Sequence, residues 1–112
     1  MYKMFGIPNC NTVKNARTYL EERKIQFEFV DLKKYKPTDA DIKLWTEKFG
    51  GLPVNKSGLT YRKYKEAYEV LSPKEKVKFI QDNTSMIKRP ILVKNSAILA
   101  FGFSEDSYKE LF

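Results

Sequence analysis

The 112-residue chain contains no histidine and a single cysteine, Cys10. The absence of histidine excludes Cys-His catalytic dyads, histidine general bases and histidine-ligated zinc sites, and we expect no metal. One cysteine cannot form a disulfide within the chain, which favours a reducing cytoplasm as the setting of this protein.

Long apolar runs are also missing. No stretch approaches the roughly 20 residues that a membrane-spanning helix needs. The first residues, in which Gly6 and Pro8 follow soon after Lys3, lack the layout of a signal peptide. We therefore expect a cytoplasmic protein that does not enter a membrane. The chain is 42% hydrophobic and 14% aromatic, which argues against disorder, and its length suits a single domain over residues 1–112.

Basic residues outnumber acidic ones, 21 to 14, which gives a net charge of +7. A basic surface can attract phosphate, nucleic acid or an acidic partner. Because acidic residues are interleaved with the basic ones almost everywhere, we favour a mixed, solvated surface over a nucleic-acid-binding face.

Apolar periodicity predicts a β-α-β unit, several helices and then a β-β-α unit. Thr38 with Asp41, and Ser72 with Glu75, are typical of capping boxes that start helices. The predicted strands cover residues 2–5, 26–32, 91–93 and 97–101, and the predicted helices cover about 12–24, 38–49, 64–71, 73–82 and the residues after 104, with a loop at 52–63. This order predicts an α/β protein with a thioredoxin-like fold and a helical insertion between its βαβ and ββα halves.

Cys10 lies where the first strand gives way to the first helix. A thiol there faces the unpaired N–H groups and the positive end of the helix, which favour the reactive thiolate. Asn11 and Thr12 can cap the helix start, and Lys14 and Arg17 add positive charge nearby. We expect a Cys10 pKa below its ordinary value. The alternative is that Cys10 is a small buried apolar residue.

Four short motifs along the chain resemble the ArsC/Spx family, and within it the small arsenate-reductase-like subgroup called YffB. They are Gly-Ile-Pro-Asn-Cys-Asn-Thr at 6–12, Gly-Leu-Thr-Tyr-Arg at 58–62, Ile-Lys-Arg-Pro at 87–90 and Phe-Gly-Phe at 101–103. Each motif is weak alone, but their order and spacing cover nearly the whole chain.

The resemblance implies roles for particular residues. Cys10 matches the family's nucleophile, Arg62 and Arg89 match arginines near the bound oxyanion, and Pro90 matches the cis-proline that faces the active cysteine. We expect Asn11, Thr12, Lys14 and Pro90 to bind substrate, and no tightly bound cofactor. The residues alone leave other interpretations open: Arg62 and Arg89 as exposed charges, Lys14 as an idle side chain, and Tyr61 and Tyr64 as packing residues.

Three positions depart from the family pattern. Gly6 stands where arsenate reductases carry a histidine, and Phe103 stands where they carry a third arginine. Val13 replaces the second cysteine of the Spx redox switch. These departures disfavour efficient arsenate reduction and a disulfide sensor.

The resulting prediction is a thiol reductase that acts through Cys10 in a one-cysteine mechanism. Glutathione is the expected co-substrate, because its carboxylates suit arginine forks around one cysteine. One alternative is a true arsenate reductase, with an oxyanion substrate and glutaredoxin as partner. Another is a non-enzymatic regulator of the Spx kind that binds RNA polymerase. The sequence leaves the physiological substrate and the oligomeric state open.

Overall fold

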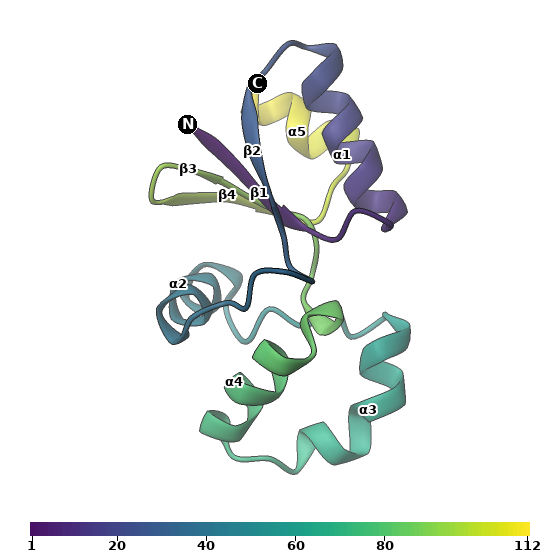
Figure 1. Ribbon diagram of the computed structural model, residues 1–112, viewed down its shortest axis with the longest axis vertical. Coiled ribbons are helices and arrows are strands. Elements are labelled where there is room, and N and C mark those ends of the chain that lie inside the picture. The colour runs from purple at the N-terminus through teal and green to yellow at the C-terminus, as the bar shows by residue number, and fades with distance from the viewer. The chain divides into compact units, whose positions relative to one another are not determined.

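The computed structural model describes residues 1–112, which form two compact units. The first, the sheet unit, consists of Met1–Leu32 and Arg89–Phe112, and the second, the helical unit, consists of Lys33–Lys88 (Figure 1). The helical unit interrupts the sheet unit in sequence, as the predicted insertion requires. None of the helices is both long enough and apolar enough to cross a membrane.

The sheet unit contains four strands in the order β2-β1-β3-β4. β1 and β2 are parallel, whereas β1–β3 and β3–β4 are antiparallel, which confirms the predicted βαβ and ββα halves. The elements are β1 (Tyr2–Gly6), α1 (Asn11–Glu22), β2 (Phe27–Asp31), β3 (Ile91–Lys94), β4 (Ala97–Phe101) and α5 (Glu105–Leu111).

The core of the sheet unit lies between the sheet and its helices. The predicted stripe of α1, at positions 13, 16 and 20, is fully buried. It packs with Met4 of β1, Leu92 of β3 and Tyr108 of α5 in one cluster. This packing fixes α1 against β1 and β3, and so it positions the residues at the start of α1.

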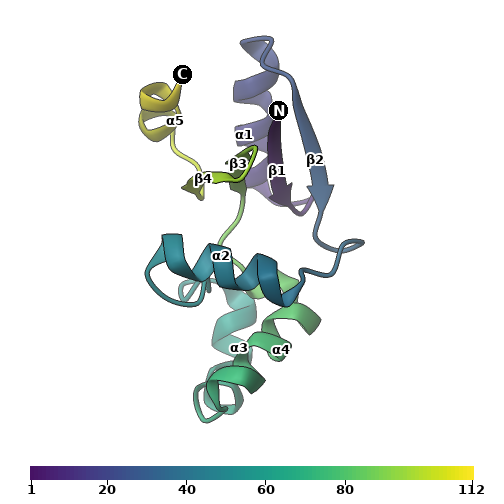
Figure 2. The same cartoon turned by 90° about the vertical axis from the view of Figure 1, so that its left-hand side faces the viewer.

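The helical unit consists of α2 (Asp39–Phe49), α3 (Leu59–Glu69), α4 (Pro73–Asp82) and the short 3₁₀ helix η1 (Thr84–Met86), drawn from the side in Figure 2. Both predicted capping boxes are present: the side chains of Thr38 and Ser72 accept the backbone N–H groups of Asp41 and Glu75. Gly50 ends α2 in the left-handed conformation, with φ of 85°.

The predicted loop at 52–63 is wrong in its second half, because α3 begins at Leu59. Tyr61 and Tyr68 are buried on one face of α3 and pack edge to face, with ring centroids 6.2 Å apart. Because the basic residues Arg62 and Lys63 follow Tyr61 directly, the apolar pattern did not predict a helix that starts at Leu59. The packing interpretation of Tyr61 is confirmed.

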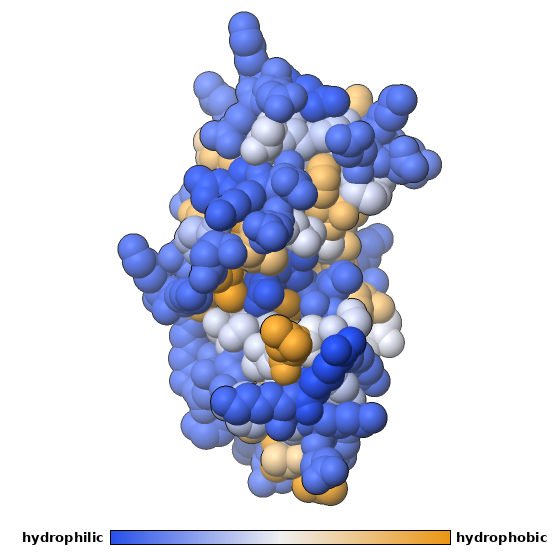
Figure 3. All heavy atoms as spheres, turned by 90° about the vertical axis from the view of Figure 1, so that its right-hand side faces the viewer, coloured by the Kyte–Doolittle hydropathy of each residue, from blue (hydrophilic) through white to orange (hydrophobic).

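Several side chains that the apolar pattern predicts to be buried are exposed to solvent. Phe49, which the pattern places on the buried stripe of α2, is 40% exposed, and Ala67 of α3 is exposed. Near the C-terminus Leu111 and Phe112 are also partly exposed, although the Phe112 ring lies 5.3 Å from that of Tyr2. On the face shown in Figure 3, hydrophilic side chains cover most of the surface, as a mixed solvated surface requires.

Candidate active site

Cys10 is the N-cap residue of α1. The chain turns after β1, where the Cys10 N–H donates to the Ile7 carbonyl at 3.1 Å, and the Cys10 carbonyl accepts the Lys14 N–H at 2.9 Å. Cys10 has extended backbone angles, and no side-chain hydrogen bond caps the helix. The prediction that Asn11 and Thr12 cap α1 is therefore wrong, because they already lie in its first turn, where both are exposed. The N-cap position places the thiol at the positive end of α1.

Arg89 reaches the same end of the sheet through the strand register. Phe5 of β1 pairs with Ile91 of β3 in an antiparallel arrangement. The residues that follow β1 and those that precede β3 therefore lie at the same end of the sheet, which brings Arg89 close to Cys10.

Pro90 lies between Arg89 and β3. The Arg89–Pro90 peptide bond is cis, as the resemblance implies. Pro90 is buried, and its carbonyl accepts the Gly102 N–H at 2.8 Å, which holds it against the chain after β4.

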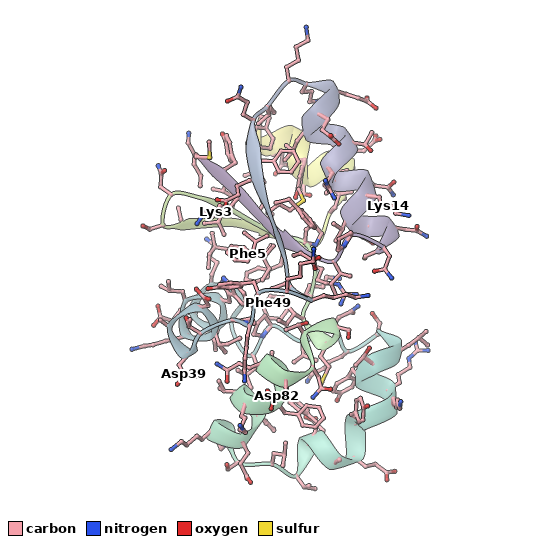
Figure 4. All side chains as sticks on the ribbon, in the orientation of Figure 1. Lys3, Phe5, Lys14, Asp39, Phe49 and Asp82 are labelled. Atoms are coloured by element: carbon pink, nitrogen blue, oxygen red, sulfur yellow. The ribbon has the colours of Figure 1, made fainter.

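The surroundings of Cys10 favour the thiolate. Partial burial by itself would raise the pKa of Cys10. The backbone N–H groups of Val13 and Thr12 and the guanidinium of Arg89 oppose it, and together they lower the pKa below its ordinary value. The predicted direction is confirmed, but the cation responsible is Arg89. Lys14 is exposed on the outer side of α1 (Figure 4).

Arg62 belongs to the other unit. It is exposed on α3, where its N–H donates to the Gly58 carbonyl at 3.2 Å. It is thus a helix residue, and the prediction of a loop at this position is wrong. The site formed within the sheet unit comprises Cys10, Arg89 and Pro90, with Asn11, Thr12 and Lys14 in the first turn of α1.

The three departures from the family pattern have structural reasons. A Cβ atom at Gly6 would lie 2.9 Å from one methyl group of Val13 and 3.0 Å from the other, so a histidine there would displace α1. Val13 is itself fully buried. The Phe103 ring packs against Tyr108, with centroids 4.7 Å apart, and against Tyr19, at 5.8 Å. These positions belong to the packing of the sheet unit.

The junction of strand and helix predicts that unpaired N–H groups face the Cys10 thiol, and the structure identifies them as those of Thr12 and Val13. Their N–H groups act on Cys10 because Cys10 is the N-cap residue, and residue identities do not reveal which residue takes that position. The structure also contains no group of three or more histidine, cysteine, aspartate or glutamate side chains that could hold a metal ion.

Comparison with known proteins identifies the family. The model of the ArsC family matches residues 5–111. The chain belongs to the ArsC family. A solved structure of a protein named YFFB is 30% identical, with a TM-score of 0.83 over 98% of this chain and 97% of that one. A possible arsenate reductase from Streptococcus mutans is 29% identical, with a TM-score of 0.79 over 99% and 97%.

A further relative is named as a transcriptional regulator. The global transcriptional regulator Spx of Staphylococcus aureus is 26% identical over 97% of this chain and 85% of the regulator. Proteins similar to this chain therefore include one named as a possible arsenate reductase and one named as a regulator, and the fold is the arsenate-reductase-like fold.

Proposed function

We propose that this ArsC-family chain is a thiol-disulfide reductase in which Cys10 is the nucleophile and glutathione is the co-substrate. One observation carries the proposal: the only thiol of the chain lies at the N-terminus of a helix, beside the Arg89 guanidinium, with a lowered pKa. These are the surroundings of a reactive cysteine.

The reaction has two steps. The Cys10 thiolate attacks one sulfur of a substrate disulfide, which forms a mixed disulfide on Cys10 and releases the other half of the substrate as a thiolate that takes up a proton. Because the chain has no second cysteine, the thiolate of glutathione then attacks the sulfur of the substrate half. The Cys10 thiolate leaves, and the product is a mixed disulfide of glutathione and substrate. A second glutathione reduces that product in solution and becomes glutathione disulfide.

The charged side chains have roles in this proposal. Arg89 stabilises the leaving thiolate of Cys10 and offers a forked donor to a carboxylate. Asn11, Thr12, Lys14 and Pro90 contact the substrate. We place the reaction in the cytoplasm, where the glutathione pool keeps thiols reduced.

Mass spectrometry tests the proposal directly. The protein incubated with glutathione disulfide should gain one glutathionyl group on Cys10, and turnover of a small disulfide should require added thiol. The Cys10→Ser variant, which has no thiol, should gain nothing and turn over nothing. Multiple turnovers without added thiol would contradict the one-cysteine mechanism.

The likeness to a possible arsenate reductase favours a second candidate, reduction of arsenate with glutaredoxin as partner. Gly6 and Phe103 argue against it, because both positions are occupied by core packing and provide no charge for an oxyanion. Incubation with arsenate, glutathione and glutaredoxin, with arsenite measured as product, distinguishes this candidate.

The Spx relative favours a third candidate, a regulator that binds RNA polymerase. Such a role would need no reactive thiol. Binding of purified RNA polymerase by Cys10→Ser as tightly as by the wild type, together with an inert Cys10, would assign the chain to this class.

A further inference from the structure

Gly102 has a backbone conformation that only glycine adopts without strain. It follows β4 directly, at the point where the chain leaves the sheet toward α5 (Figure 1). Gly102 is buried, and its φ of 76° lies in the left-handed region. In that region the Cβ atom of an L-residue comes too close to its own backbone. The groups on either side of Gly102 show what this turn holds in place.

The N–H group of Gly102 extends the pairing of β3 and β4 by one residue. Ile91 of β3 pairs with Phe101 of β4. Pro90 and Gly102 are therefore the next pair along these antiparallel strands, and the Gly102 N–H donates to the Pro90 carbonyl at 2.8 Å. Proline has no N–H group that could return the bond. The backbones of this pair are thus joined by a single hydrogen bond.

The residue after Gly102 is held in the core of the sheet unit. The Phe103 ring packs edge to face on Tyr108, with centroids 4.7 Å apart, and its centroid lies 5.8 Å from that of Tyr19. A different φ at Gly102 would move either Phe103 away from these rings or the N–H group away from Pro90. Because the rings make many contacts and Pro90 is held by one bond, we expect the bond to Pro90 to be lost first.

Arg89 is the residue that this bond affects, because it precedes Pro90 directly. Its guanidinium attracts the Cys10 thiolate and donates a hydrogen bond to it. Hydrogen bonds weaken steeply when donor and acceptor are misaligned, so a small displacement of Pro90 would be felt at the sulfur. We propose that Gly102 is a positioning residue that, by holding Pro90, places the Arg89 guanidinium against the reactive sulfur.

The proposal rests on the part of the proposed function that makes Cys10 a reactive thiol, and it does not depend on the substrate. Alkylation of Cys10 measures this reactivity without glutathione or any protein partner. A reactive Cys10 that is insensitive to residue 102 would overturn the role of Gly102 and leave the proposed reductase intact. An inert Cys10 in the wild type would overturn both.

Gly102→Ala tests the turn, because it keeps the N–H group and disfavours the left-handed conformation. At about pH 7, below the ordinary pKa of cysteine, iodoacetamide should alkylate Cys10 of this variant at least about threefold more slowly than in the wild type, because less of the thiol is ionised. Asparagine tolerates the left-handed region better than alanine does. Gly102→Asn should therefore react at a rate between those of the wild type and Gly102→Ala. Circular dichroism shows that each variant is folded.

Gly50→Ala is the matched control. Gly50 ends α2 in the helical unit with a similar φ of 85°, and a Cβ atom there would meet nothing within 4 Å. The variant imposes the same kind of backbone strain away from Pro90. Its unfolding midpoint in urea should fall, whereas its alkylation rate should stay within about 1.5-fold of the wild-type rate.

A double variant tests whether Gly102 acts through Arg89. Gly102→Ala/Arg89→Gln should alkylate within about 1.5-fold of the rate of Arg89→Gln alone, because the group that Gly102 positions is already absent. Three results would overturn the proposal: a wild-type rate in folded Gly102→Ala, equal slowing in Gly50→Ala, or a further threefold slowing in the double variant. Where Gly102→Ala does not fold, Gly102→Asn replaces it in each comparison.

Discussion

Three neighbouring groups lower the pKa of Cys10 against the effect of its partial burial: the N–H groups of Val13 and Thr12 and the guanidinium of Arg89. We expect Arg89→Gln to raise the pKa of Cys10 toward its ordinary value, because the variant removes the charge but keeps a polar side chain of moderate size. The rate of alkylation by iodoacetamide against pH measures this pKa. A wild-type midpoint at or above the ordinary value would leave Cys10 as a packing residue.

Arg89→Lys separates geometry from charge at the same position. Lysine keeps the positive charge and loses the planar fork that holds a carboxylate through two hydrogen bonds. Turnover with glutathione should fall about tenfold or more, which corresponds to about 1.4 kcal/mol. Unfolding in urea should change by less than about 0.5 kcal/mol. A loss of stability that matches the loss of activity would make Arg89 a structural residue.

Tyr108 is a different kind of residue, a fully buried side chain whose hydroxyl has no hydrogen-bond partner. Burial raises the pKa of this phenol well above its usual range. We expect Tyr108→Phe to leave the free energy of unfolding unchanged or to raise it by about 1 kcal/mol, because the variant removes only the uncompensated polar group. Tyr108→Ala, which removes the ring from the cluster with Tyr19 and Phe103, should cost about 3–5 kcal/mol. Destabilisation by Tyr108→Phe would show that the hydroxyl has a partner in solution.

At the scale of elements, the start of α1 has a cysteine where α2, α4 and α5 have a hydroxyl cap. Serine is among the best N-cap residues and alanine among the poor ones. At a pH below the folded-state pKa of Cys10, where the thiol is protonated, Cys10→Ser should therefore unfold at the same urea concentration as the wild type or a higher one. Cys10→Ala should be about 0.5–2 kcal/mol less stable than Cys10→Ser. Equal stabilities of the two variants would show that the cap position contributes nothing to folding.

The same pair of proteins gives a pH dependence. The pKa of Cys10 is lower in the folded chain than in the unfolded one. As the pH rises, the thiol therefore loses its proton at a lower pH in the folded chain. The stability of the wild type relative to Cys10→Ser should rise as the pH rises from the folded-state pKa to the ordinary value. It should be lost as the pH falls through the folded-state pKa. A difference that does not change with pH would mean that the thiol has the same pKa in both states.

The helix starts and the Cys10–Arg89 pair show which features a single sequence can predict and which it cannot. The starts of α2 and α4 were predictable because both ends of each capping box are within four residues of sequence, at Thr38–Asp41 and Ser72–Glu75. The start of α3 was not, because Gly58 caps it without a side chain and its buried face consists of tyrosines separated by basic residues. In the site, the position of Cys10 follows from local pattern, whereas its pairing with Arg89 depends on the register between β1 and β3. That register is a contact between residues far apart in sequence, which a single sequence does not reveal.

At the scale of the whole molecule, charge is distributed unevenly: the helical unit carries +6, and the sheet unit, which holds Cys10, carries +1. The charge therefore acts on the proposed reaction mainly as a field that attracts anions, because the direct contact with the thiolate comes from Arg89 alone. Glutathione, whose two carboxylates outnumber its one amine, is an anion of the kind that this field attracts.

Salt separates these two contributions. At an ionic strength of about 0.15 M the screening length is about 8 Å, and at 1 M it is about 3 Å, so added salt weakens long-range attraction far more than a contact between buried groups. We expect kcat/KM for glutathione to fall several-fold as sodium chloride rises from about 0.05 M to about 0.5 M, with kcat nearly constant, because association slows and the chemistry at Cys10 does not change. Cysteamine, a thiol with one positive charge and no carboxylate, is the matched control, and its kcat/KM should stay constant or rise with salt. The same decline for both thiols would show that salt acts on the Cys10–Arg89 pair itself and that the net charge has no part in bringing glutathione to the site.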